Sequence, residues 1–415
     1  MSGREVAILA LIAGIAAGCA SDAGSGAADA PAAAWCEAHP DGAEVALTPA
    51  DDEGTWGREG LGSPNFFELW RAGGLNEDED LAFPLNASVS HAGRLAIADW
   101  ELGNLSIVER DGRWIGDWAA RGQGPGELAL PAAARWIGAS DTVVVFDIGN
   151  GRVVFLSDGR PVRPHVLVDP GFLAPILISG EVGWVGVTPA AGVLIAPAPT
   201  APADSEDADA AAPILFQRAR ASEVDTLVTV AIPTMRARPP YGTLTAPGWP
   251  RPVAALGGDG SIVVGGMDGR YRILRLEESG DTIGMICRDT RALPFSERER
   301  HADRDDDYVA ALEEAIAAVP HPDSLAQFGR LFLSVEGNLW VQRDRPSALR
   351  FGDAYHGVPG ALYDVFDPAG RYLGEVRAPE NARLQAALGD TVWAYEIGEL
   401  DETWVVAYEL HWAAE

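Results

Sequence analysis

Three closely spaced glycines in this sequence could expose backbone N–H groups to an anion. They lie in the stretch RGQGPGELALP, residues 121–131, as Gly122, Gly124 and Gly126. A phosphate-binding loop needs Lys and then Ser or Thr after its last glycine, or a GxGxxG pattern that leads into a helix, and this stretch has neither. Glu127 follows directly and would repel a phosphate. The stretch is therefore predicted to be a tight turn whose glycines occupy positions that need positive φ.

Carboxylate and amide side chains recur where apolar runs end. Asp99 and Asp147 each end such a run, and Asn104 and Asn150 follow them. Their oxygen atoms are the kind of ligand that Ca²⁺ prefers, so these four residues are weak candidates for a metal site. The competing role, which we favour, is an Asp that accepts hydrogen bonds from the backbone of the following turn, with Arg152 as a pairing partner. The sequence contains no HExxH, GxSxG or CxxC motif.

The elements that position these residues are short strands with period-two alternation, separated by Gly, Asp and Asn turns. Two segments align, GRLAIADWELGNLSIVERDGRWIGDW from Gly93 and DTVVVFDIGNGRVVFLSDGRPVRPHVL from Asp141. Their strand-ending aspartates lie 48 positions apart, a spacing typical of one four-stranded propeller blade. Weaker copies begin at Asp259 and after Leu331. Counting from Asn86 gives six units, and a strand near residues 65–70 is expected to join the last sheet and close the ring.

The segment GQGPGEL followed by P, then a strand, D, GNGR, a strand and DG, resembles the six-bladed β-propeller lipoproteins of bacteria, relatives of the NHL-repeat propellers. The resemblance covers about residues 66–412, and Leu128 stands where the family's turn has an aromatic residue. It implies an all-β fold, a six-bladed β-propeller of four-stranded antiparallel blades, with the glycine turn near the rim of a funnel. Five residues are then candidates for binding at the funnel or rim: Arg121, Gln123, Glu127, Asp99 and Asp147.

One segment has a helical pattern instead. Ser296 is a plausible N-cap, and Tyr308, Leu312 and Ile316 recur at helical spacing before Pro320 ends the pattern. We therefore expect a short helical insertion over about residues 296–318. The resembled family has such insertions ahead of its fifth blade. A packing element on the side of the fold is favoured over a lid, because charged helix faces are usually only solvated.

The start of the chain predicts export. Residues 6–18 are a short apolar run, so residues 1–18 are interpreted as a signal peptide. The run ends at AAGC, which resembles a bacterial lipobox and predicts that Cys19 is lipidated; an ordinary secretory signal is the alternative. By the same resemblance, Ala20 after the cysteine favours the outer membrane. Residues 19–42 are small and polar and are expected to form a flexible tether, followed by a single propeller domain over 43–415.

Two further cysteines, Cys36 and Cys287, are left in a chain that is expected to mature outside the cytosol. An oxidising compartment allows them to form a disulfide. The sequence leaves this open, because it does not show how far apart the two residues lie in space.

The formal net charge of -30, with arginine as the only basic residue type besides histidine, disfavours nucleic acid and anionic lipid as partners. We expect a monomer that contacts the membrane only through its lipid. The favoured function is a non-enzymatic binding module that presents its funnel to a peptide, glycan or protein and needs no cofactor. The alternative is a metal-dependent hydrolase or lyase, because lactonase-type propellers resemble this chain in architecture and bind calcium or zinc in their central channel.

Overall fold

A computed structural model describes Cys36 and most of the chain from residue 44 onward. The described ranges are 44–74, 81–168, 182–188, 193–197, 212–220, 223–232, 234–236, 243–245, 253–265, 270–277, 280–290, 294, 327–343, 360–400 and 402–412. Within 182–185 and 193–245 only the backbone is described. The signal peptide, Cys19 and the helix expected over about 296–318 lie outside the described residues.

The fold is built from four-stranded meanders in which each strand pairs antiparallel with the next one in the chain. The first two sheets consist of β3 (Pro84–Val89), β4 (Leu95–Asp99), β5 (Asn104–Val108) and β6 (Trp114–Ala119), and of β7 (Pro131–Trp136), β8 (Val143–Asp147), β9 (Arg152–Ser157) and β10 (Arg160–Pro161), with β11 (Val166–Leu167) also paired to β9. A further sheet contains β12 (Val182–Val187), β13 (Val193–Pro197), β14 (Ala212–Arg220) and β15 (Glu223–Ile232), and is followed by the hairpin of β16 (Thr234–Arg236) and β17 (Thr243–Thr245).

The second half of the chain repeats the pattern. Its sheets consist of β18 (Val253–Leu256), β19 (Ile262–Gly265), β20 (Arg272–Leu276) and β21 (Thr282–Arg288); of β22 (Phe328–Leu333), β23 (Leu339–Arg343), β24 (Leu362–Phe366) and β25 (Tyr372–Arg377); and of β26 (Ala382–Leu388), β27 (Thr391–Ile397) and β28 (Thr403–His411). Two early strands complete the outer edges. β2 (Asn65–Gly73) pairs antiparallel with β28, and β1 (Glu44–Thr48) pairs parallel with β21.

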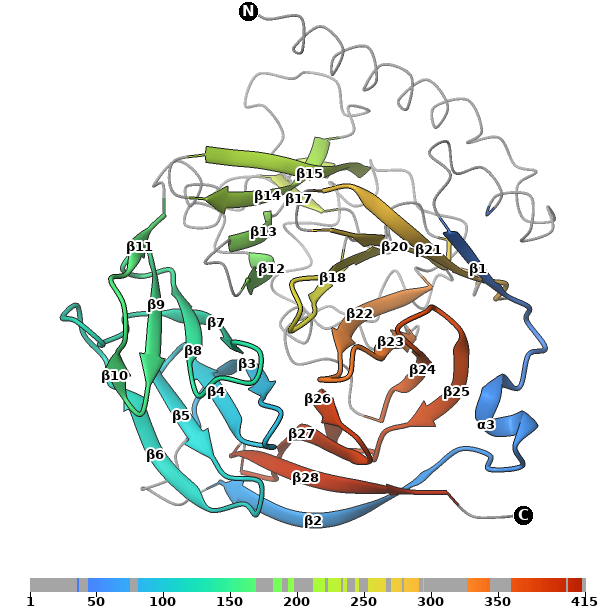
Figure 1. Ribbon diagram of the computed structural model, residues 1–415, viewed down its shortest axis with the longest axis horizontal. Coiled ribbons are helices and arrows are strands. Elements are labelled where there is room, and N and C mark those ends of the chain that lie inside the picture. Colours follow the sequence, from blue (N-terminus) through green and yellow to red (C-terminus); the bar gives the residue numbers. More distant parts are fainter. Residues whose placement is uncertain are drawn as a thin grey trace, which may run out of the picture.

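The sheets stand around a common centre, with β3, β7, β12, β18, β22 and β26 nearest to it (Figure 1). The fold is therefore an all-β propeller with mainly antiparallel four-stranded blades. The structure describes five blades with their side chains rather than the six expected, because the β12–β15 sheet is described almost entirely through its backbone. Helix is nearly absent from the described residues, where α3 (Gly54–Arg58) is a single short turn.

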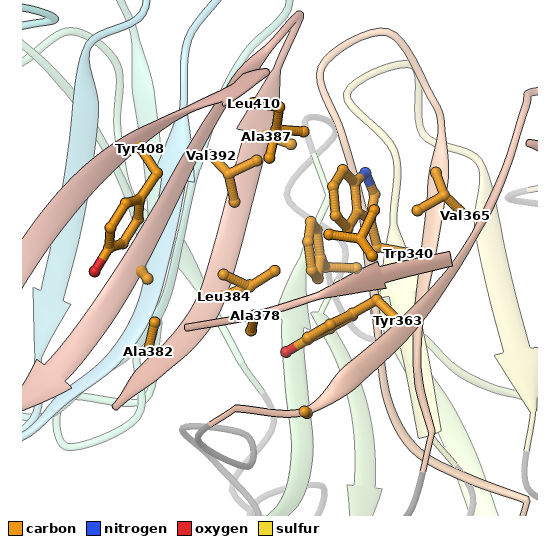
Figure 2. Packing of buried hydrophobic residues seen from close by; sticks show 14 of the residues in the cluster. Trp340, Tyr363, Val365, Ala378, Ala382, Leu384, Ala387, Val392, Tyr408 and Leu410 are labelled. Atoms are coloured by element: carbon orange, nitrogen blue, oxygen red, sulfur yellow. The ribbon is translucent and has the colours of Figure 1, made fainter. Parts of the chain in front are cut away.

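The middle strands differ from the expected period-two alternation. All residues of β4, β5 and β8 are buried, on both faces of their sheets. A blade is covered on each side by another blade, so a middle strand needs apolar side chains on both faces. The apolar clusters accordingly lie between blades. One cluster between the last two blades contains Trp340, Tyr363 and Tyr408 (Figure 2).

One blade interface contains a buried ionic cluster beside its apolar side chains. Asp364 on β24 is fully buried, and four side chains donate hydrogen bonds to its carboxylate. Arg343 donates twice, at 2.8 and 2.6 Å, Tyr271 donates at 2.8 Å and Tyr372 at 3.2 Å, and Arg288 from the neighbouring blade pairs with the same group. Two cations on one anion would leave a net positive charge, and Glu375 offsets it at 3.0 Å from Arg343.

The outer edge of the β18–β21 sheet is fixed to the start of the described chain. Cys36 and Cys287 are joined by a disulfide and are both buried. Directly beside Cys287, the parallel pairing of β1 with β21 continues the sheet outward. The segment before the propeller is thus tied to a blade that lies about 250 residues later in the chain.

The buried cluster around Asp364 makes the free energy of unfolding depend on pH in the alkaline range. Burial, with the neighbouring Asp364 carboxylate, raises the pKa of Tyr372 to about 12 from its ordinary value of 10. The folded state therefore favours the neutral phenol, and this stabilisation is complete below pH 10 and is lost as pH rises through about 12. Between about pH 9 and pH 11 the free energy of unfolding of the wild type should fall as this stabilisation is lost. In Tyr372→Phe we expect that fall to be smaller by about 1 kcal/mol, as measured by urea denaturation at each pH. Equal falls in both proteins would contradict this assignment.

Candidate functional site

The glycine loop between β6 and β7 folds back on itself. Gly122 donates a backbone hydrogen bond to the Leu128 carbonyl at 2.8 Å, and the Gly124 N–H donates to the Glu127 carboxylate at 2.7 Å. Of the three glycines only Gly126 has positive φ, at 80°. The expectation that all three need positive φ was therefore wrong. Gly122 and Gly124 have a different reason to lack a side chain, because a Cβ there would come within 2.1 and 2.9 Å of a Glu127 carboxylate oxygen.

The next blade holds this loop in place. In the turn between β8 and β9, Asn150 donates to the Gly122 carbonyl at 2.9 Å, and Arg152 donates to the carbonyls of Gly124 and Glu127, both at 2.9 Å. Leu128 is fully buried and anchors the loop in the core. The three candidate rim residues Arg121, Gln123 and Glu127 are exposed on this ordered loop. Arg121 donates to the Glu101 carbonyl at 3.3 Å.

Asp99 and Asp147 lie inside the fold rather than at the rim, and both are fully buried. Asp99 accepts hydrogen bonds from the backbone N–H groups of Ala82, Phe83 and Leu102, each at 2.9 Å. Asp147 accepts from the N–H groups of Ala129 and Leu130, at 3.0 and 3.1 Å, and from Asn150 at 2.6 Å. Each carboxylate joins the segment that enters its blade to the turn at the end of the second strand, which is a structural role.

The four weak metal candidates do not converge. Asp99 with Asn104 and Asp147 with Asn150 belong to separate blades, and their polar atoms are used locally. Asn104 donates to Asp117 at 2.9 Å, although its own Oδ1 is buried without a partner. Within the described ranges, no three His, Cys, Asp or Glu side chains lie together as a metal site would require.

Polar side chains on the inner wall join one blade to the next. Asn86 on β3 accepts a hydrogen bond from the Ala134 N–H of β7 at 2.9 Å, and Ser88 accepts from the Trp136 N–H at 3.3 Å. Farther round the ring, Arg330 on β22 donates to the Leu384 carbonyl of β26 at 2.8 Å and to Gln385 at 2.6 Å. These contacts satisfy backbone groups on the inner edge of each following blade, where no strand pairs.

Arg135, on β7, is also a cation on an innermost strand, but it donates no hydrogen bond to the described backbone of the next blade. It keeps a partly exposed side chain although protein surrounds it, and this burial lowers its pKa to about 10. Among the described residues, Asp259 is the one acidic group near enough to raise the pKa of Arg135 again. Asp259 lies in the turn after β18, on the opposite side of the β12–β15 sheet. No hydrogen bond or ion pair joins the Arg135 guanidinium to a described residue. An enclosed cation at the central wall can therefore receive an anionic group from solvent.

Sequence reasoning missed Arg135 and Arg330, because each is a single arginine in a short run. A usable signal was present in PAAARW and FGRLFL, where one cation interrupts an otherwise apolar inner strand. Such a residue needs a partner for its charge, and Arg330 finds one at the free backbone edge of the next blade. The described part of the chain contains no helix long and apolar enough to cross a membrane.

No protein-family model matches the sequence, and no curated protein matches it. Solved structures are similar in architecture. A member of the DUF4221 family from Bacteroides vulgatus is 9% identical with a TM-score of 0.49, over 85% of this chain and 100% of that chain. A gluconolactonase from Xanthomonas campestris is 13% identical with a TM-score of 0.41, over 88% and 97%. Virginiamycin B lyase from Staphylococcus aureus is 14% identical with a TM-score of 0.35, over 85% and 90%.

The hydrogen bonds of Asp147 imply a stability effect without a binding effect. Asp147→Ala leaves two backbone N–H groups and the Asn150 amide without their acceptor, so we expect the free energy of unfolding to fall by about 2–3 kcal/mol. Asp141→Ala is the matched control, because its carboxylate is exposed and pairs only with a surface arginine; it should change stability by less than about 0.5 kcal/mol. Urea denaturation of both variants measures the difference, and equal values would show that the Asp147 bonds contribute nothing.

Proposed function

We propose that this protein is an exported, lipid-anchored, non-enzymatic binding module that receives an acidic group of a peptide, glycan or protein in the centre of its ring. In this proposal the propeller has six blades, the β12–β15 sheet being the sixth. The support for the sixth blade is that β12 contacts β7 on one side and β18 on the other, so the sheet fills the interval between their blades (Figure 1).

The observation that carries the binding proposal is Arg135. A charge enclosed by protein costs folding stability unless it is paired, and the lowered pKa of Arg135 records that cost. Its neighbours on β7 are small or apolar, so a neutral side chain at this position would fold at least as well. A destabilising charge on the wall of a channel is the arrangement expected where a ligand supplies the missing partner.

The net charge of the chain narrows the class of ligand. An overall charge of -30 repels long polyanions such as nucleic acid. At physiological ionic strength, however, surface charges are screened beyond about 8 Å, so Arg135 determines the local field inside the channel. One or two carboxylates on a peptide or glycan therefore fit better than a polyphosphate.

The lactonase-type alternative has less support from the described residues. Both oxygens of the Asp99 carboxylate and both of the Asp147 carboxylate already accept hydrogen bonds within the fold. A metal would have to displace these bonds, and the turns depend on them. We therefore favour binding over metal-dependent hydrolysis.

The lipid anchor is tested by labelling. Expressed in a bacterium with an outer membrane and fed an alkyne-bearing fatty acid, the full-length protein should incorporate the label and fractionate with the outer membrane. Cys19→Ser should lose the label and appear in the soluble periplasmic fraction. An unlabelled wild type, or a labelled variant, would overturn the anchor and leave the ordinary secretory signal.

The binding proposal is tested by Arg135→Met, which keeps an unbranched, flexible side chain and removes its charge. We expect the free energy of unfolding to rise by about 1–2 kcal/mol, because a buried charge is replaced by an apolar group. Binding of a diglutamate peptide or a digalacturonate, measured by calorimetry in physiological salt, should weaken more than about tenfold.

Arg113→Met is the control, because this arginine is exposed on an outer hairpin, and it should alter neither quantity. Unchanged affinity in Arg135→Met would reject the channel site. The site is likewise rejected if neither acidic probe binds the wild type.

A further inference from the structure

A cavity of about 240 Å³ lies between the last two blades, and neither Arg135 nor the glycine loop contributes to its lining. Its floor and sides are formed by three indoles, Trp56, Trp340 and Trp412, together with aliphatic side chains such as Val365 and Leu410. Its polar residues come from the turns after β22 and after β26. The glycine loop precedes an innermost strand and these turns follow one, so the cavity opens on the opposite face of the ring.

Two of the indoles that line this cavity carry an unsatisfied hydrogen-bond donor. The indole Nε1 atoms of Trp340 and Trp412 are buried and have no hydrogen-bond partner in the described structure. Trp340 is itself only 3% exposed. In Figure 2 its indole nitrogen lies at the end of the ring that points away from Tyr363 and toward the side where Val365 lies. A buried N–H without an acceptor costs about 1–3 kcal/mol, which a ligand oxygen in the cavity would recover.

Carboxylates stand at the polar side of the same cavity. Glu336 accepts hydrogen bonds from the Gly389 N–H at 2.8 Å and from Ser334 at 2.9 Å, and so holds the two turns together. Asp390, beside it, has an exposed side chain. Each carboxylate oxygen has two acceptor sites, so both groups can accept further hydrogen bonds from a ligand.

These features select one class of ligand. A cation would suit the carboxylates and the aromatic faces but would leave both indole N–H groups unsatisfied. An anion would satisfy the N–H groups but would be repelled by Glu336 and Asp390. A hydroxyl group accepts from an indole N–H and also donates to a carboxylate, and the ring carbons of a sugar can lie against the indole faces.

We propose that this cavity binds a single neutral polyhydroxylated ring, such as a pyranose or the terminal residue of a glycan. Its volume lies below the range of about 300–1,000 Å³ that accommodates drug-sized ligands, which limits the occupant to one ring. The site uses neither Arg135 nor the rim loop, so it is independent of the channel proposal and can fail or succeed separately.

Indole N–H resonances report on the two donors directly. The ¹⁵N-labelled full-length protein has 13 tryptophans, and the Trp340→Phe and Trp412→Phe variants assign the two cross-peaks of interest. We expect glucose, galactose or N-acetylglucosamine, titrated to tens of millimolar, to shift both cross-peaks saturably and to leave the indoles that do not line the cavity unchanged. A hydrogen bond to the donors forms only if the ring occupies the cavity, so this readout separates binding from a merely structural role.

Variants then test the donor and acceptor roles. Trp412→Phe keeps an aromatic ring and removes one N–H, and it should weaken sugar binding by about two- to tenfold. Asp390→Asn keeps the size of an exposed side chain and should weaken it by a similar factor. Trp118→Phe, at a T-shaped Trp pair with Trp136 in an earlier blade interface, is the matched control and should have no effect.

Three results would overturn the proposal. The first is the absence of any shift of the Trp340 and Trp412 cross-peaks with all three sugars. The second is sugar binding that is equally strong in Trp412→Phe, Asp390→Asn and the wild type. The third is saturable binding of tetramethylammonium at these indoles, which would assign the cavity to cations instead.

Discussion

The innermost strand of each blade has one backbone edge with no strand beside it, and the arrangement of the ring depends on how that edge is satisfied. Unpaired N–H and C=O groups at the centre of a compact fold are costly, so the preceding blade supplies partners from its own innermost strand. Asn86 and Ser88 do this for β7, and Arg330 does it for β26. The same bonds fix the spacing between blades and make the channel wall polar, and Arg135 differs from these residues because it makes no such bond to a described residue.

The interfaces between blades use three different kinds of physical interaction. The first two blades meet through an apolar layer that includes a T-shaped contact between Trp118 and Trp136. The β18–β21 and β22–β25 blades meet at the buried carboxylate of Asp364. The last two blades pack aromatic rings together but leave a cavity between them. A propeller needs every interface to exclude water, but it does not need them all to be filled in the same way, so one interface can leave space for a ligand.

Local patterns in the sequence predicted the blades well. The aspartates 48 positions apart, the D-G turns and the short apolar runs indicated the strand order of the first two blades and the partnership between residues 65–70 and the last sheet. The turn role favoured for Asp99 and Asp147 describes part of their contacts. Each accepts one hydrogen bond from the following turn and two more from a segment 16–18 residues earlier, which no local pattern indicated. The Asp364 cluster and the three-indole cavity could not be predicted, because their members come from segments far apart in the chain. The sequence did not indicate why residues 122 and 124 must be glycine, because the reason is the position of the Glu127 side chain in the folded loop.

The closure of the ring has a consequence for how the protein acquires its structure. β2 precedes the first complete blade in the chain, yet the strand with which it pairs is β28, more than 300 residues later. During synthesis the early strand must therefore remain without its partner until nearly the whole chain is available, and its free edge is open to wrong pairing throughout that time. A chain interrupted before β28 has its earlier blades but no closed ring, and its β2 has no strand to pair with.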